Sequence, residues 1–432
     1  MAASTHCGSG PPAGAAPGKS QLQRDVENLG RQHDARDGAT AKQSRPPMRY
    51  EAFKGWRGIC ALLIALHHFG AAGYIYDLSI IRHAPPAVDF FFVLSGFTLA
   101  YVYSGRLNSA GDVGTLLWRR LGRIWPLHAI VLVAFIGLEV LASVIAAKTG
   151  VPRRMAMFDP ESAGQLAAIP THLLLLHSFG LHDQLTWNVP SWSISAEFWI
   201  YLVFALVILF VRRWATVAGF GLSLLGLAVV VANVEEMGDA HYSFGFFRCL
   251  CDFFLGLAVY RITKRFPARL AMASAVEVVA VFAAYVYVAY FSTGQLSFAA
   301  PLVCGILVWI FSHEAGIVSR VLESRPFAAI GNWSFSIYII HSLLIILINR
   351  GASFAQQRLG TPLLIELQTN HGPHQQLNFG GPLVMDAVTI AYVVVLIALA
   401  AFTTRFVEKP LQKKWNGLLK PRAVVVPHAV TA

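Results

Sequence analysis

The sequence predicts an all-α polytopic membrane protein, with about ten transmembrane helices in one bundle and both termini in the cytoplasm. Three observations support this fold class. The 432 residues are 56% hydrophobic and only 13% charged, whereas soluble domains carry about 25% charged residues. The apolar runs are long and do not alternate, which argues against a β-barrel. Basic residues concentrate in every second connecting segment, as the positive-inside rule requires.

Ten apolar runs have the length of a helix that crosses a bilayer. A further run from His172 to Gly180 is too short to span, and we expect an interfacial or re-entrant piece there. The ten predicted spans are residues 58–76, 87–104, 124–146, 191–211, 214–233, 245–262, 271–291, 296–313, 327–348 and 385–406.

The regions outside the spans differ in composition. Residues 1–47 hold almost no large apolar side chains, so we expect a disordered tail. They lack the apolar core of a signal peptide, and Met48 is an alternative start. Residues 48–415 form the expected membrane domain, and residues 416–432 form a basic cytoplasmic tail.

The net charge of +11 fits the cytoplasmic segments of a protein in the cell (inner or plasma) membrane. Nucleic-acid binding is a poor explanation, because no basic soluble domain is present. The five cysteines show no CxxC or Cys/His zinc spacing, so no metal site is expected.

The first span carries ionisable side chains, in the stretch GWRGICALLIALHHF. Arg57 and His68 are eleven residues apart, which is three helical turns plus about 20°, so they share one face. His67 points about 100° away. Their separation along the axis is roughly 16 Å, which puts Arg57 at the cytoplasmic edge and His68 near mid-membrane. Such groups are costly in lipid and face a cavity or the bundle interior; a neutral, hydrogen-bonded histidine is the alternative to a functional one.

The second span opens with Asp89, followed by an aromatic run and then Ser95 and Gly96. A carboxylate is favourable at a helix N-terminus, so capping is the simpler explanation of Asp89 than catalysis. Gly96 would let another main chain approach closely.

Three arginines precede the third span, namely Arg119, Arg120 and Arg123. Their spacing puts Arg123 on one face with each of the other two. A cytoplasmic arginine cluster suits lipid head groups or the phosphates of a cofactor, although positive-inside topology alone also explains it.

Two later stretches add polar side chains to apolar helices. Ser193 and Glu197 lie one turn apart beside Trp192, and the Glu197 carboxylate needs a partner or a proton at its depth. Glu197 is a candidate for orienting a histidine. Tyr338 and His341 continue a polar stripe that begins at Ser334. Interhelical hydrogen bonding and ligand contact explain this stripe equally well.

These stretches, in this order, resemble the acyltransferase-3 family of integral-membrane O-acyltransferases. The resemblance runs from Tyr50 to about Trp415. It rests on Arg57-x10-His68, Val88-Asp89-Phe90-Phe91 with Ser95-Gly96-Phe97, Arg120-x-x-Arg123, Trp192-Ser193-x-x-x-Glu197, Gly331-x-x-Ser334-x-Ser336-x-Tyr338-x-x-His341 and Glu408-x-Pro410.

The resemblance implies transfer of an acyl group, usually acetyl, from acyl-CoA to a hydroxyl of a carbohydrate, lipid-linked or other surface or secreted acceptor. It implies His68 as the essential histidine, Arg57 as its companion and the arginine pair as a cofactor contact. From these residues we expect His68 to act as a general base, with Glu197 orienting its ring. A membrane transporter that uses intramembrane His, Glu and Arg is the alternative function, and a binding-only accessory protein is a third.

Overall fold

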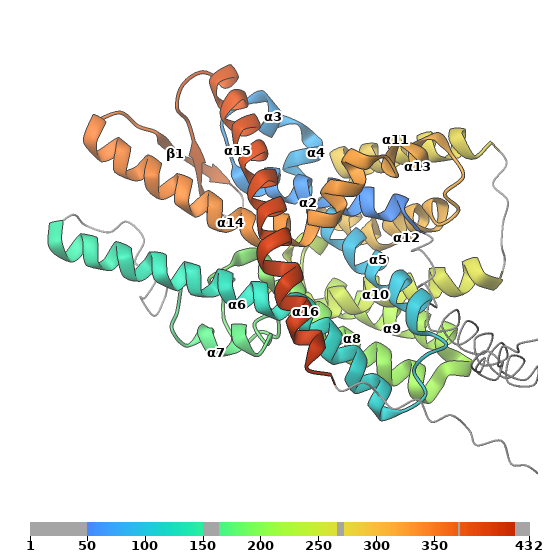
Figure 1. Ribbon diagram of the computed structural model, residues 1–432. Coiled ribbons are helices and arrows are strands. Elements are labelled where there is room, and N and C mark those ends of the chain that lie inside the picture. Colours follow the sequence, from blue (N-terminus) through green and yellow to red (C-terminus); the bar gives the residue numbers. More distant parts are fainter. Residues whose placement is uncertain (1–49, 150–163, 266–271, 370–371, 420–432) are drawn as a thin grey trace, which may run out of the picture. The chain divides into compact units, whose positions relative to one another are not determined.

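The computed structural model describes residues 50–149, 164–265, 272–369 and 372–419, and this part of the chain is almost entirely helical (Figure 1). The expected tail 1–47 and most of the basic segment 416–432 lie outside it. The elements are α2 Ala52–Phe69, α3 Tyr74–Asp77, α4 Ser79–Arg82, α5 Pro86–Tyr103, α6 Ala110–Thr149, α7 Ala168–Leu173, η1 Val189–Ser191, α8 Trp192–Val211, η2 Arg212–Trp214, α9 Ala215–Asn233, η3 Met237–Asp239, α10 Gly245–Arg265, α11 Ala273–Tyr290, η4 Gly294–Ala299, α12 Ala300–Phe311, α13 Ile317–Leu322, α14 Arg325–Leu359, β1 Leu364–Thr369, β2 Gly372–Leu377, α15 Pro382–Thr403, η5 Thr404–Glu408 and α16 Lys409–Gly417.

Each predicted span overlaps a long helix, so the all-α polytopic fold is confirmed. In the described residues, seven helical segments are long and apolar enough to cross a membrane, and one of them, 189–233, contains both α8 and α9. Helices α2 and α10 are not among the seven, because charged side chains interrupt them. The number of crossings and the cytoplasmic termini therefore stay predictions.

The first helix begins and ends about six residues earlier than the sequence predicts. It ends at Phe69 because Gly70 adopts a left-handed conformation, with φ 57° and ψ 53°. His67 and His68 consequently occupy its last turn rather than its middle.

Two pairs of helices approach so closely that only glycine fits between them. A Cβ on Gly96 of α5 would collide with the carbonyl oxygen of Phe253 on α10, and one on Gly256 of α10 would collide with that of Val93. Gly58 of α2 packs in the same way against Gly331 of α14. The close approach expected at Gly96 is present.

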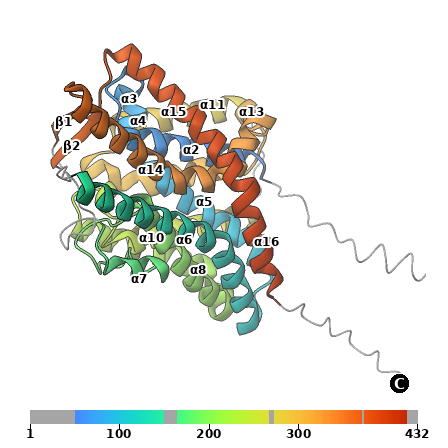
Figure 2. The ribbon, with the colours of Figure 1, turned by 60° about the vertical axis from the view of Figure 1, so that its left-hand side comes forward.

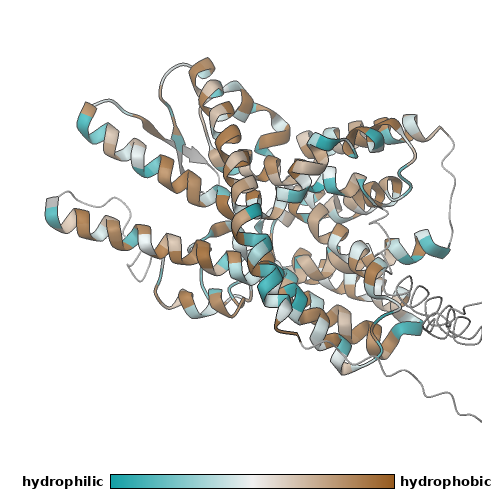
Figure 3. Ribbon diagram, viewed as in Figure 1, coloured by the Kyte–Doolittle hydropathy of each residue, from teal (hydrophilic) through white to brown (hydrophobic). Residues whose placement is uncertain are grey.

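The faces turned away from the bundle are apolar. Figure 3 shows hydrophobic residues along most of α6 and α15, with hydrophilic residues gathered at helix ends and on α16. Large exposed side chains include Val133 and Leu141 of α6, Phe282 of α11 and Val394 of α15. An apolar surface of this extent suits contact with lipid.

The segment before α8 enters the bundle. Asn188 donates its side-chain amide to the carbonyl of Ile339, midway along α14, and Ser342 donates to the Asn188 side-chain oxygen. Trp187 is buried beside it. The interfacial or re-entrant piece expected from His172 to Gly180 stays a prediction.

At the other end of the chain, α15 continues through the π-helical turn η5 into α16 as one rod (Figure 2). α16 is fixed on α6 by Trp118 and Trp415, whose rings stack at 4.8 Å and whose indole N–H groups each donate to the other's carbonyl. The antiparallel hairpin β1–β2 is the one departure from the all-α prediction in the described residues.

Candidate active site

A cavity of about 60 Å³ lies inside the bundle, where α2, α5, α8 and α14 meet. By this measure a water occupies about 10–15 Å³, so the cavity has room for a few waters or a group of acetyl size. Its wall combines aromatic rings with five of the predicted site residues, namely Arg57, Ser95, Ser193, Glu197 and Tyr338. The remaining lining residues are Val88, Phe91, Phe92, Ile194, Ser334 and Phe335.

One part of the cavity wall carries the charged groups Arg57 and Glu197. The Ser95 hydroxyl of α5 donates to Glu197 Oε1 of α8 at 2.5 Å, so the partner that Glu197 required is a serine. Arg57 of α2 interacts electrostatically with Glu197 and Tyr201. No hydrogen bond or ion pair within the described residues occupies its guanidinium, which leaves planar N–H donors for an anionic ligand.

The predicted arginine cluster stands beside this wall. Arg120 lies over the ring of Tyr201, 5.1 Å from its centroid, and both Arg120 and Arg123 interact electrostatically with Arg57. Arg119 is exposed on another face of α6. The structure therefore groups Arg57, Arg120 and Arg123 and leaves Arg119 apart.

A hydroxyl pair forms another part of the cavity wall. Ser193 and Tyr338 lie 2.8 Å apart, and both hydroxyls are within hydrogen-bonding distance of the Pro190 carbonyl. The Ser193 and Tyr338 hydroxyls each have one proton to donate. Rotation of one hydroxyl proton would direct it to a ligand oxygen, while the other hydroxyl keeps its contact with the Pro190 carbonyl.

His68 lies beyond Tyr338, next to His341 of α14. Nδ1 of His68 is 2.9 Å from the Ile64 carbonyl and 3.2 Å from Nε2 of His341, and the ring of His341 is 5.9 Å from that of Tyr338. His67 instead places Nδ1 3.0 Å from the Ile81 carbonyl, as expected from its different direction on the helix.

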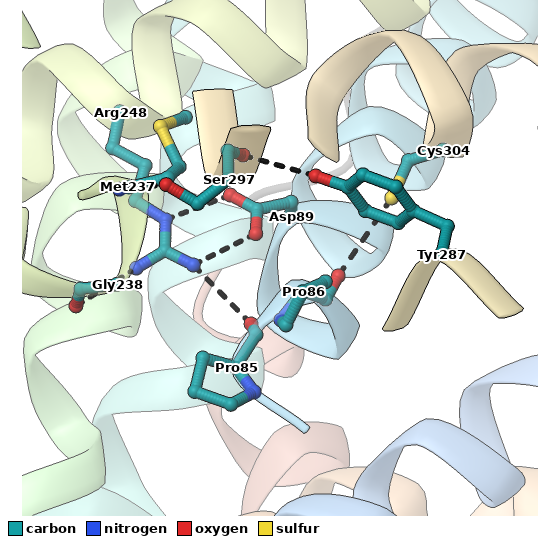
Figure 4. Close-up of polar contacts among 9 residues, drawn as sticks. All are labelled: Pro85, Pro86, Asp89, Met237, Gly238, Arg248, Tyr287, Ser297 and Cys304. Carbon is teal, nitrogen blue, oxygen red and sulfur yellow. Dashed lines mark hydrogen bonds and ion pairs between the residues drawn. The ribbon is translucent and has the colours of Figure 1, made fainter. Parts of the chain in front are cut away.

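Asp89 does not line the cavity and is one half of a buried ion pair (Figure 4). It receives two hydrogen bonds from Arg248 of α10, both at 2.7 Å, and both side chains are about 1% exposed. Arg248 also donates to the carbonyls of Pro85 and Gly238, and Trp192 packs on it at 5.5 Å. Asp89 and Trp192 thus belong to a structural cluster next to the cavity.

Arg248 was missed by the sequence reasoning, although a signal existed. It stands in an apolar span, in the stretch FFRCLCDFF, where an arginine requires a buried anionic partner. Cys249 and Cys251 of the same stretch are buried free thiols, and the described residues contain no group of three side chains placed to hold a metal ion.

The chain is similar in sequence to known proteins. No solved structure matches the chain. Acyltransferase MdmB from Streptomyces mycarofaciens is 26% identical over 334 residues, covering 69% of this chain and 80% of that protein. Protein 2 in picA locus from Rhizobium radiobacter is 31% identical over 196 residues, covering 43% of this chain and 92% of that protein. The family model described as an acyltransferase domain matches residues 50–405, so the chain belongs to the acyltransferase-3 family.

Proposed function

We propose that this acyltransferase moves an acetyl group from acetyl-CoA to a hydroxyl of a carbohydrate or other surface or secreted molecule, in the cell membrane. The observation that carries the proposal is a series of polar groups along α2, which would form the path of the donor. Arg57 lines the cavity of acetyl size and interacts electrostatically with Arg120 and Arg123, and His68 with its neighbour His341 lies eleven residues further along the helix.

The length of this path suits coenzyme A. Arg57 and His68 stand eleven residues apart on one continuous helix, which is roughly 16 Å along the axis. About thirteen bonds separate the pyrophosphate of CoA from its sulfur, and an extended chain advances about 1.27 Å per bond, which also gives roughly 16 Å. Phosphates held at Arg57, Arg120 and Arg123 would therefore present the thioester near His68.

The chemistry follows from the state of His68. A carbonyl oxygen only accepts hydrogen bonds, so the contact with Ile64 puts the ring proton on Nδ1. A neutral ring then carries its lone pair on Nε2, as a general base needs. In the proposed step Nε2 takes the proton of the acceptor hydroxyl, the oxygen attacks the thioester carbonyl, and CoA leaves as a thiolate. The Ser193–Tyr338 hydroxyl pair is placed to donate to the developing oxyanion.

The test uses membranes from cells that produce the protein, supplied with [14C]acetyl-CoA and the native acceptor. We expect His68→Ala to lower the rate of transfer about 10²–10⁴-fold, the usual contribution of a general base, whereas His67→Ala retains most activity. Mass spectrometry of surface glycans with and without the gene identifies the acceptor. Wild-type rates for a well-expressed His68→Ala protein would refute the mechanism, and absence of any acyl-CoA-dependent product would favour the transporter alternative.

The arginine assignment has its own test. Arg120→Ala with Arg123→Ala should raise the KM for acetyl-CoA at least tenfold, because two charge-assisted contacts to phosphate are lost, at about 1.5–3 kcal/mol each. Arg119→Ala is the matched control from the same turn of α6, and its effect should be much smaller. Equal effects of all three substitutions would indicate that the arginines serve membrane topology and do not bind the cofactor.

A further inference from the structure

His68 and His341 form a direct polar contact between two helices. Both side chains come from tightly associated helices, α2 and α14, and His341 is fully buried. Nε2 of His341 faces Nδ1 of His68 at 3.2 Å. The His341 ring also interacts with the main-chain carbonyls of Ile337 and Tyr338, one turn earlier on its own helix.

We propose that His341 is the positioning residue of the catalytic histidine, in the role that a carboxylate has in other acyl-transfer sites. This inference rests on the proposed function and adds a residue to it. It also replaces the expected role of Glu197, whose carboxylate is engaged by Ser95.

The hydrogen-bond arithmetic fixes the role of each nitrogen. Because Nδ1 of His68 must carry a proton to reach the Ile64 carbonyl, Nε2 of His341 can only accept from it. The Nδ1–H group of His68 is thus shared between two acceptors, the Ile64 carbonyl and His341. The shared proton holds the ring in one tautomer and one orientation, and leaves Nε2 as the basic nitrogen.

The same contact stabilises the ring after it has taken the acceptor's proton. The positive charge that appears on His68 is spread over Nδ1–H, and the lone pair of His341 points at that group. A neutral imidazole does this without a second buried charge, which would be costly at this depth. His67 also contacts the His68 ring, with a distance of 5.3 Å between the ring centroids.

Two substitutions separate positioning from space-filling. In His341→Gln the side-chain amide can place an oxygen acceptor close to the position of Nε2. In His341→Met a side chain of similar reach fills the site and provides only a weak acceptor. We expect His341→Met to lower kcat for [14C]acetyl transfer about a hundredfold with little change in the KM for acetyl-CoA, and His341→Gln to retain activity within about tenfold of the wild type.

Two further readouts would not respond to a merely structural residue. In His341→Met, the acid limb of the pH–activity profile should move to lower pH, because protonated His68 has lost its acceptor. The double variant His68→Ala with His341→Met should be no slower than His68→Ala alone, because His341 acts through His68.

The outcomes distinguish this inference from the proposed function. Equal rates for His341→Met and His341→Gln, an effect on KM rather than kcat, or additive losses in the double variant would overturn the positioning role while transfer by the wild type stands. A wild-type protein that transfers no acetyl group would overturn the proposed function itself. Both variants are first checked for folding by size-exclusion chromatography in detergent.

Discussion

The buried ion pair between Asp89 and Arg248 allows a quantitative test of the division between structural and catalytic charges. Of the four hydrogen bonds that the Arg248 guanidinium donates, the two to Asp89 are 2.7 Å long, and those to the Pro85 and Gly238 carbonyls are 3.2 and 3.4 Å. Asp89→Asn removes the counter-charge and turns an amide N–H₂ toward the guanidinium. Breaking one partner of such a buried pair costs about 3–5 kcal/mol, which is a hundredfold to several thousandfold in the folding equilibrium.

The assay is SDS-induced unfolding in mixed micelles, combined as a double-mutant cycle. We expect Asp89→Leu with Arg248→Met to lose clearly less than the sum of the two single losses, because the ion pair is then removed as a unit. The remaining cost comes from the two carbonyls and from the buried Asp252, which interacts with both side chains. The exposed pair Lys54–Glu51 provides the control, with side chains 25% and 42% exposed. Glu51→Gln should cost under about 1 kcal/mol.

Two results would contradict this account of Asp89. One is a loss in Asp89→Asn no greater than that in Glu51→Gln. The other is a double-variant loss equal to the sum of the single losses, because the two side chains would then not depend on each other. Acetyl transfer by the stable double variant would further separate Asp89 from the reacting groups.

Three more predictions concern the helices around the site. Burial raises the pKa of Glu314, which caps the start of α2, to about 7, so the stability that this group contributes is fully present below about pH 4.5 and is lost as the pH rises through 7. Glu314→Gln should therefore make the thermal unfolding temperature less dependent on pH between pH 5 and 8, and the same pH dependence in the variant and the wild type would refute this. Gly58→Ala should lower kcat more than tenfold, because a Cβ there would lie 2.8 Å from a main-chain nitrogen of α14, whereas Gly137→Ala, in open space, should leave it unchanged. Trp415→Ala should expose the segment near residues 409–417 to protease, because α16 then loses its stacking and hydrogen bonds with Trp118; an unchanged digestion pattern would contradict the proposed anchoring.

The fold was predictable because its signal is local. A helix in lipid must satisfy its own main chain and present apolar side chains, so each span is visible as a run in the sequence. The ends of the helices were less predictable. Gly70 ends α2 because it adopts a left-handed conformation. The apolar residues that continue to Tyr76 would instead predict a longer helix.

The site was predictable only where it depends on one helix. The rule of 3.6 residues per turn put Arg57 and His68 on a shared face, and α2 is continuous between them. Contacts between helices depend on which helices are neighbours, and periodicity does not record that. Periodicity predicts that Glu197 orients a histidine, whereas in the structure its carboxylate accepts a hydrogen bond from the Ser95 hydroxyl. For the same reason, periodicity does not predict that Asp89 pairs with Arg248 of α10.

The contact between His68 and His341 follows from a glycine contact about 15 Å away. Gly58 meets Gly331 where α2 and α14 touch, and ten residues later on each helix His68 meets His341. Equal steps along both helices mean that they run parallel and side by side over this stretch, with a rise of about 1.5 Å per residue on each. The close approach at the glycines therefore sets the level and the distance at which the two imidazoles face each other. Neither glycine is near the reacting atoms in the proposed mechanism, yet both would decide whether His68 keeps its acceptor.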